Sequence, residues 1–81
     1  MRVLPEQITT TWIDTLTDVD LIEVEARVHS KFTVLERREK KLRGARFQLM
    51  RGSAELIHTW DRWSRLHSAT RERSLRPRRD K

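Results

Sequence analysis

The sequence predicts an all-α fold, in which a long central helix packs against a C-terminal helix that folds back along it. A shorter helix precedes them. Three observations support this fold: an apolar residue every seven positions from Leu21 to Leu49, a helix-start signal at Thr17, and a break at 51–53. Residues three, four and seven apart share one helix face. We expect a helical hairpin or small bundle, completed by dimerisation or a partner because 81 residues bury only a modest core.

The central helix is predicted over residues 18–50. Thr17 can cap its N-terminus, and Asp18 and Asp20 place negative charge where the helix dipole favours it. A helix of roughly 33 residues would be about 50 Å long. Gly44 lies inside this range, costs about 1 kcal/mol relative to Ala, and either marks a close helix crossing or is tolerated. The apolar row consists of Leu21, Val28, Leu35, Leu42 and Leu49.

Two other arrangements of this helix stay open. A parallel zipper needs apolar residues at both the a and d positions, whereas the d row contains Lys31 and Arg38, so a hairpin is favoured. The seven-residue phase also continues unbroken across Gly52 to Leu56 and Trp63. That continuity allows one helix from residue 18 to 73 instead of a break at Gly52.

The flanking segments are predicted to be helical as well. Pro5 suits a first helical turn, and Ile8, Trp12 and Leu16 follow helical spacing, so a short helix is expected over about 5–16, although three consecutive threonines favour a strand. The third helix is expected over 54–73, with Ser53 before it. We expect residues 1–73 to form one domain and residues 74–81 to form a basic, flexible tail that Pro77 separates from the helix.

The charge is unevenly distributed along the chain. Its net charge is +6; residues 1–30 hold two basic and six acidic residues, whereas residues 31–81 hold sixteen basic and six acidic residues. This asymmetry indicates an anionic partner for the C-terminal part. The sequence has no cysteine, no apolar run that could span a membrane, and no signal-peptide core at its start. We therefore expect a cytoplasmic protein without a membrane partner.

The basic residues of the central helix and tail form the predicted nucleic-acid site, because Lys and Arg displace counterions from phosphates. DNA and RNA both remain candidate ligands, and the predicted role is that of a non-catalytic accessory or regulatory protein. The alternative for the helix cluster is ion pairing with the acidic N-terminal turn of a second copy in an antiparallel dimer. The residues assigned to nucleic-acid binding are Arg37, Arg38, Lys40, Lys41, Arg43, Arg46, Arg71, Arg73, Arg76, Arg78 and Arg79.

A protein-interaction module is the competing function. In this reading the apolar stripe and the tryptophans of the third helix dock onto a component of transcription, translation or phage assembly. Burial of the tryptophans in the chain's own core is the simpler explanation of their helical spacing, and base stacking is a further one. The predicted interface residues are Leu35, Leu42, Leu49, Leu56, Trp60 and Trp63.

We expect no enzymatic activity, cofactor, metal ion or small-molecule substrate. The sequence has no Gly-rich phosphate loop, nucleophile elbow or paired-histidine zinc motif. Glu55 and His58 have the spacing of carboxylate-bridged metal bundles, but the chain holds only one copy of that spacing.

Overall fold

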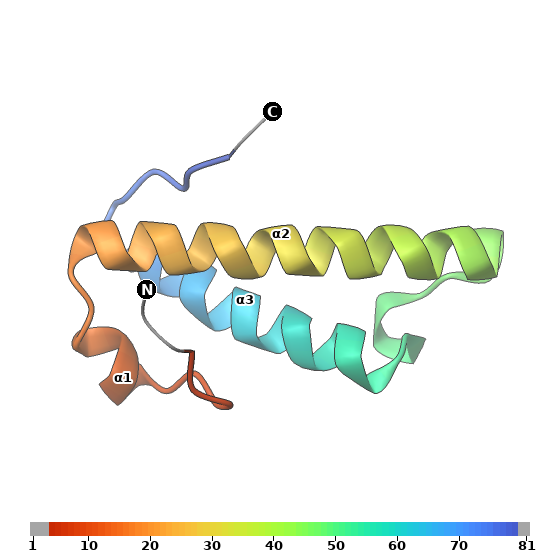
Figure 1. The fold of residues 1–81 in the computed structure, drawn as a ribbon, viewed down its shortest axis with the longest axis horizontal. Helices are drawn as coiled ribbons and strands as arrows, with labels where there is room; N and C mark the ends of the chain where they lie inside the picture. The colour runs from red at the N-terminus through yellow and green to blue at the C-terminus, as the bar shows by residue number, and fades with distance from the viewer. Residues whose placement is uncertain (1–3, 80–81) are drawn as a thin grey trace.

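A helical hairpin with a short helix across one end forms the chain (Figure 1). The computed structural model describes residues 4–79. Its elements are α1 (Thr10–Asp14), α2 (Asp18–Arg43), the 3-10 turns η1 (Gly44–Arg46) and η2 (Leu49–Arg51), and α3 (Ala54–Glu72). No β-strand occurs within residues 4–79. The predicted all-α fold, with a long central helix packed against the C-terminal helix, is confirmed, whereas its completion by a second copy or a partner stays a prediction.

The start of α2 follows the predicted capping. Thr17 Oγ1 accepts a hydrogen bond from the backbone N–H of Asp20 at 3.1 Å, and Asp18 and Asp20 lie in the first turn. At 1.5 Å per residue the 26 residues of α2 extend about 39 Å. The molecule measures 39 × 27 × 24 Å, so α2 alone sets its longest dimension.

The predicted end of this helix at residue 50 is wrong. Helix α2 ends at Arg43, because Gly44 adopts a φ of +59° and a ψ of −133°, which redirects the chain. Glycine reaches this conformation readily, whereas an L-residue with a side chain is strained there. Of the two roles considered for Gly44, neither a helix crossing nor tolerance inside the helix is correct, and residues 44–51 form two 3-10 turns instead.

The third helix begins at the predicted break. Ser53 Oγ accepts a hydrogen bond from the N–H of Leu56 at 3.1 Å, which caps α3, and α3 ends at Glu72, one residue before the predicted end. The chain reverses between α2 and α3 (Figure 1), so the alternative of one helix from 18 to 73 is wrong. The apolar side of α2 packs on α3 of the same chain, which also removes the face that a zipper would need.

The first helix is shorter than the predicted range of 5–16. Thr9 accepts a hydrogen bond from the N–H of Trp12, and the hydroxyl of Thr15 donates to the carbonyl of Trp12, so these two threonines bracket a helix of five residues. Ile13 of α1 is buried against the hairpin. The sequence therefore predicted this helix correctly but overestimated its length.

The core consists of two clusters along the hairpin. The larger lies where α1 covers the start of α2 and the end of α3, and the smaller lies at the far end, beneath the 3-10 turns. The indole of Trp63 packs against the larger cluster and stacks on the ring of Phe32 in the smaller one, with the ring centroids 5.7 Å apart. The larger cluster contains Ile8, Ile13, Leu16, Leu21, Val24, Val28, Leu66 and Ala69, and the smaller contains Phe32, Leu35 and Leu56.

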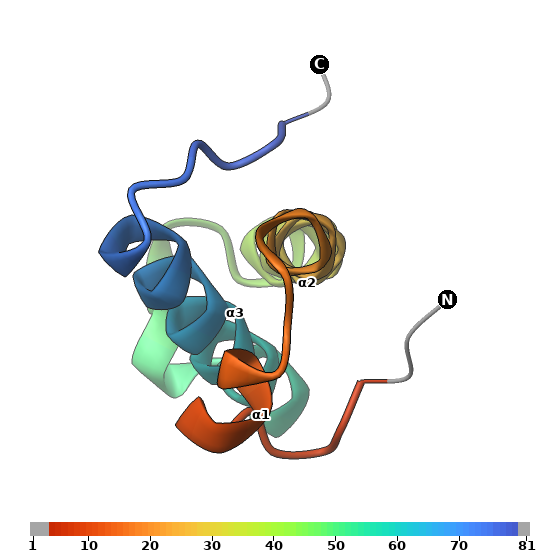
Figure 2. The same ribbon diagram turned by 90° about the vertical axis from the view of Figure 1, so that its left-hand side faces the viewer.

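The segment after α3 runs back along α2. In Figures 1 and 2 it lies above α2, whereas α1 lies below it. Ser74 has a φ of +58°, its N–H donates to the carbonyl of Arg71, and the N–H of Leu75 donates to that of Thr70. These two bonds form a Schellman motif, which turns the chain sharply out of a helix. Leu75 then packs on the larger core cluster, so the first part of the predicted flexible tail is anchored.

Candidate nucleic-acid interface

The outer side of α2 carries exposed cations near its C-terminal end. Arg37, Arg38 and Lys41 are exposed. At 100° per residue Arg37 and Lys41 project opposite to the buried row that contains Val28 and Leu35, and Arg38 lies at the flank. Within residues 4–79 no carboxylate lies within ion-pair distance of these three cations, and the same holds for Arg46 in η1.

Two other cations of the predicted cluster are used within the fold. Lys40 Nζ lies 3.6 Å from Glu36 Oε1 and 5.6 Å from the ring centre of Phe47. Arg43 Nε lies 3.4 Å from Glu39 Oε1, and its Nη1 donates to the carbonyl of Arg51 at 3.1 Å. The contacts of Lys40 with Phe47 and of Arg43 with Arg51 hold the 44–51 connection on α2. The ion pairs partly neutralise the charges of Lys40 and Arg43.

The C-terminal arginines likewise fall into two groups, one exposed and one bonded to the rest of the chain. Arg71, Arg76 and Arg78 are exposed, whereas Arg73 and Arg79 bond to the body of the protein. Arg73 donates to the carbonyls of Leu16 and Ile13 at 2.9 and 3.0 Å and lies 3.1 Å from Asp18 Oδ1. This guanidinium satisfies carbonyls at the end of α1 and so ties α1 to the end of α3.

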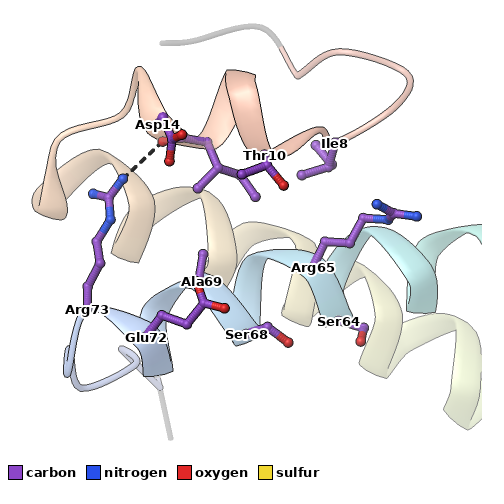
Figure 3. A pocket seen from close by; sticks show the side chains of 10 residues that line it. Ile8, Thr10, Asp14, Ser64, Arg65, Ser68, Ala69, Glu72 and Arg73 are labelled. Carbon is purple, nitrogen blue, oxygen red and sulfur yellow. Dashed lines mark hydrogen bonds between the residues drawn. The ribbon is translucent and has the colours of Figure 1, made fainter.

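A groove of about 360 Å³ lies beside this arginine, between α1 and α3 (Figure 3). Ser64, Arg65, Ser68 and Glu72 of α3 line one wall, and Thr10 belongs to the other. The dashed line in Figure 3 marks the bond from Arg73 to the backbone carbonyl of Ile13. The lining carries both signs of charge, which gives the groove no strong preference for an anion or a cation.

The most buried charged group was not identified from the sequence. Glu25 on α2 has no exposed surface, and its carboxylate faces donors from α3 and the tail. Arg79 donates through Nη1 to Oε1 at 2.7 Å and through Nη2 to Oε2 at 2.8 Å, which is a bidentate pair. Trp63 Nε1 donates to Oε2 at 3.3 Å, and His67 Nδ1 lies 3.0 Å from the same oxygen.

This environment shifts the pKa of three side chains. Burial alone would raise the pKa of Glu25, but hydrogen bonds from Arg79, His67 and Trp63 outweigh it and hold that pKa below its usual value. The hydrogen bond to Glu25 raises the pKa of Arg79. Burial, together with the charge of Arg79, lowers the pKa of His29. Glu25 is therefore an anion and His29 is neutral at pH 7.

The tail forms a shallow hollow with α2 beside this pair. Its volume is about 210 Å³, and Ser30 and Thr33 of α2 lie opposite Arg78. Thr33, Arg37 and Lys41 follow one another at intervals of four residues, so these three residues share one side of α2. The exposed cations Arg78, Arg37 and Lys41 consequently form a track along α2.

The residues predicted to form a protein interface have different surroundings. Leu35 and Leu56 are buried inside the hairpin, and Leu49 and Trp60 are partly buried against the same cluster. Trp63 is partly buried between Phe32 and His67. Leu42 is 76% exposed, so it alone of the predicted set is displayed openly.

No metal or membrane feature adds to this surface in the part of the chain that the structure describes. No three His, Asp or Glu side chains gather there as ligands for a metal ion, and Glu55 and His58, whose spacing matches that of metal bundles, are exposed. No helix among residues 4–79 is long and apolar enough to cross a bilayer. Comparisons with protein-family models, with curated proteins and with solved structures gave no match for this chain.

Proposed function

We propose that the protein binds nucleic acid without catalysis, through phosphate contacts along the outer side of α2 and the tail. The observation that carries this proposal is the track of exposed cations Arg78, Arg37 and Lys41, with Arg38 at its flank. Arg37, Arg38 and Lys41 have no intramolecular carboxylate partner within residues 4–79. Unpaired cations in a row suit a phosphate backbone, because each one releases a condensed counterion on binding.

The charge around the track supports the same ligand. Residues 31–51 contain eight basic and two acidic residues, and both acidic residues already pair with Lys40 and Arg43. The unpaired cations thus keep their full attraction for an anion. Contacts of this kind position a nucleic acid and give little base preference, which fits DNA and RNA alike.

The salt dependence of binding tests this proposal. Four contacts, made by Arg37, Arg38, Lys41 and Arg78, predict a slope of log K against log salt of about −3.6 on duplex DNA. Fluorescence anisotropy of a short labelled duplex, measured between about 50 and 200 mM salt, gives that slope. A labelled single-stranded RNA provides the parallel measurement. Absence of binding to both nucleic acids at the lowest salt would refute the proposal.

A pair of charge-matched variants separates the track from net charge. Arg37→Gln/Lys41→Gln removes two unpaired cations of the track and is expected to reduce the slope by about 1.8. The control, Lys40→Gln/Arg65→Gln, removes the same charge from cations that pair with Glu36 and Asp61. We expect the control to bind more tightly than the track variant at every salt concentration. Equal losses in both variants would show that only net charge matters.

One observation favours the protein-interaction alternative. Leu42 and Met50 are 76% and 61% exposed at the far end of the hairpin, where apolar side chains could contact another protein. Capture of binding partners from an extract of the native host, with and without nuclease treatment, distinguishes the two functions. Nuclease-sensitive capture by the wild type supports the phosphate track. Capture that survives nuclease but is lost in Leu42→Gln/Met50→Gln supports the alternative.

A further inference from the structure

We propose that Glu25, with the aromatic side chains around it, is a binding site for the guanidinium of an arginine on an extended peptide. In the structure the chain's own Arg79 fills it. This inference does not depend on nucleic-acid binding, because the ligand is a cation.

The two long helices hold the carboxylate in place without the tail. Trp63 Nε1 and His67 Nδ1, both from α3, lie 3.3 and 3.0 Å from Glu25 Oε2. The rings are themselves held by stacking: the ring centroids of Trp63 and His67 are 5.0 Å apart, and those of Trp63 and Phe32 are 5.7 Å apart. A carboxylate held by packed rings and hydrogen bonds keeps its orientation when a ligand leaves.

The oxygens that remain available select a guanidinium. Glu25 Oε1 accepts only from Arg79 within residues 4–79, and both oxygens receive one parallel N–H each from its two terminal nitrogens. The planar fork of arginine matches this bidentate geometry, whereas the ammonium of lysine supplies a single point charge. Glu25 has no exposed surface beneath Arg79, and a carboxylate in that position is costly unless a cation lies beside it. The pocket therefore needs a cation and prefers arginine.

The tail holds its own arginine weakly enough for exchange. Between Leu75, which packs on the core, and Arg79, the residues Arg76 and Arg78 are exposed. None of residues 76–78 bonds to α2 or α3 in the described part of the chain, and the hollow of about 210 Å³ lies under Arg78. The bidentate pair of Arg79 with Glu25 is therefore the polar contact that holds residues 76–79 on α2 in the described part of the chain. A tether of this length gives an effective concentration in the millimolar range, which a peptide in trans can match.

The test uses the full-length Arg79→Ala chain and a fluorescent peptide with the sequence of residues 74–81. Anisotropy should show the peptide binding to this variant at least about tenfold more tightly than to the wild type, in which the tethered Arg79 competes. Arg78→Ala, which removes the same charge from an exposed side chain, should behave like the wild type. Equal affinity of the peptide for the wild type and Arg79→Ala would overturn the proposal.

Peptide variants make the test independent of the fold. The peptide with citrulline in place of Arg79 should lose binding to Arg79→Ala, and the peptide with lysine there should bind about tenfold more weakly than the arginine form. Glu25→Gln combined with Arg79→Ala should abolish binding of the parent peptide. Should Arg79→Ala not fold alone, the parent peptide and not the citrulline peptide should restore its helical circular dichroism. Binding that ignores the citrulline change, or no recovery of helicity by the parent peptide, would refute the site.

Discussion

Glu25 lies on the buried side of α2 because it follows Val24 and precedes Val28, which both face the core. A carboxylate at such a position is costly unless charged donors surround it. Arg79 supplies the charge, and Trp63 and His67 hold the same oxygen from α3. This one residue thereby joins α2, α3 and the tail.

His29, one turn beyond Glu25, should make the stability depend on pH. Its pKa is lowered in the folded chain by burial and by Arg79, so the unfolded chain binds more protons as the pH falls below about 6.5. The folded state therefore loses stability with falling pH. The lowered pKa of Glu25 also makes the folded state lose stability as the pH falls, but at pH values around and below the ordinary pKa of glutamate.

Urea unfolding of the wild type and His29→Gln at pH 7 and pH 5 measures this effect. The decrease in unfolding free energy between the two pH values should be smaller in His29→Gln. His58→Gln changes an exposed histidine of α3 and should keep the wild-type decrease. A decrease that is the same in all three proteins would contradict the assigned role of His29.

The Glu25–Arg79 pair could not be predicted from the sequence. Its two residues are 54 positions apart, and Arg79 stands in a basic segment that resembles a disordered tail. A glutamate between two valines of an amphipathic helix also lies close to the boundary of the apolar stripe. Only the Schellman turn at Ser74 directs the tail back over α2, and serine gives little sequence signal for a left-handed residue.

At the scale of the helices, two left-handed residues set where the chain turns. Gly44 ends α2 with a φ of +59°, and Ser74 follows α3 with a φ of +58°. Glycine adopts such angles without a Cβ penalty, whereas an L-residue with a side chain pays about 1–2 kcal/mol. The backbone conformation at position 44 therefore suits its glycine, whereas the conformation at position 74 strains its serine.

Substitutions at these two positions should have opposite effects on stability. Gly44→Ala is expected to lower the unfolding free energy by at least about 1 kcal/mol. A Cβ at this position meets no atom within 4 Å, so the loss reports the backbone alone. Ser74→Gly should raise the unfolding free energy by up to about 1 kcal/mol. Urea denaturation measures both, and a neutral Gly44→Ala would contradict this account of the end of α2.

The starts of α2 and α3 were predictable, whereas the end of α2 was not. Thr17 and Ser53 cap α2 and α3 as their residue types indicate. The predicted extension to residue 50 relied on Leu42 and Leu49 continuing the apolar row. Leu42 is exposed and Leu49 packs back from η2, so the seven-residue spacing beyond Leu35 is coincidental. The positive φ of Gly44 ends the helix although the seven-residue apolar spacing continues past it.

At the scale of the whole molecule, opposite charges gather at the two ends of α2. Residues 4–30 contain six acidic residues and one basic residue, whereas residues 31–51 contain eight basic and two acidic residues. The sequence alone predicted this polarity. It did not predict that Arg73 and Arg79 are paired, because their partners Asp18 and Glu25 are more than 50 positions away and meet them only in the folded chain. The pairs of Lys40 with Glu36 and of Arg43 with Glu39 follow the four-residue spacing of the helix. The fold therefore narrows the candidate site to the cations that point outward.

The most direct test of this narrowed site is a titration of the isotope-labelled protein with a short DNA duplex, followed by NMR chemical-shift changes. The account predicts that the largest changes occur at Arg37, Arg38, Lys41 and Arg78, and that they disappear as salt is raised. Small changes are expected at α1 and at the ion-paired Arg65. Changes centred on Leu42 and Met50, or spread evenly over all arginines, would contradict the proposed phosphate track.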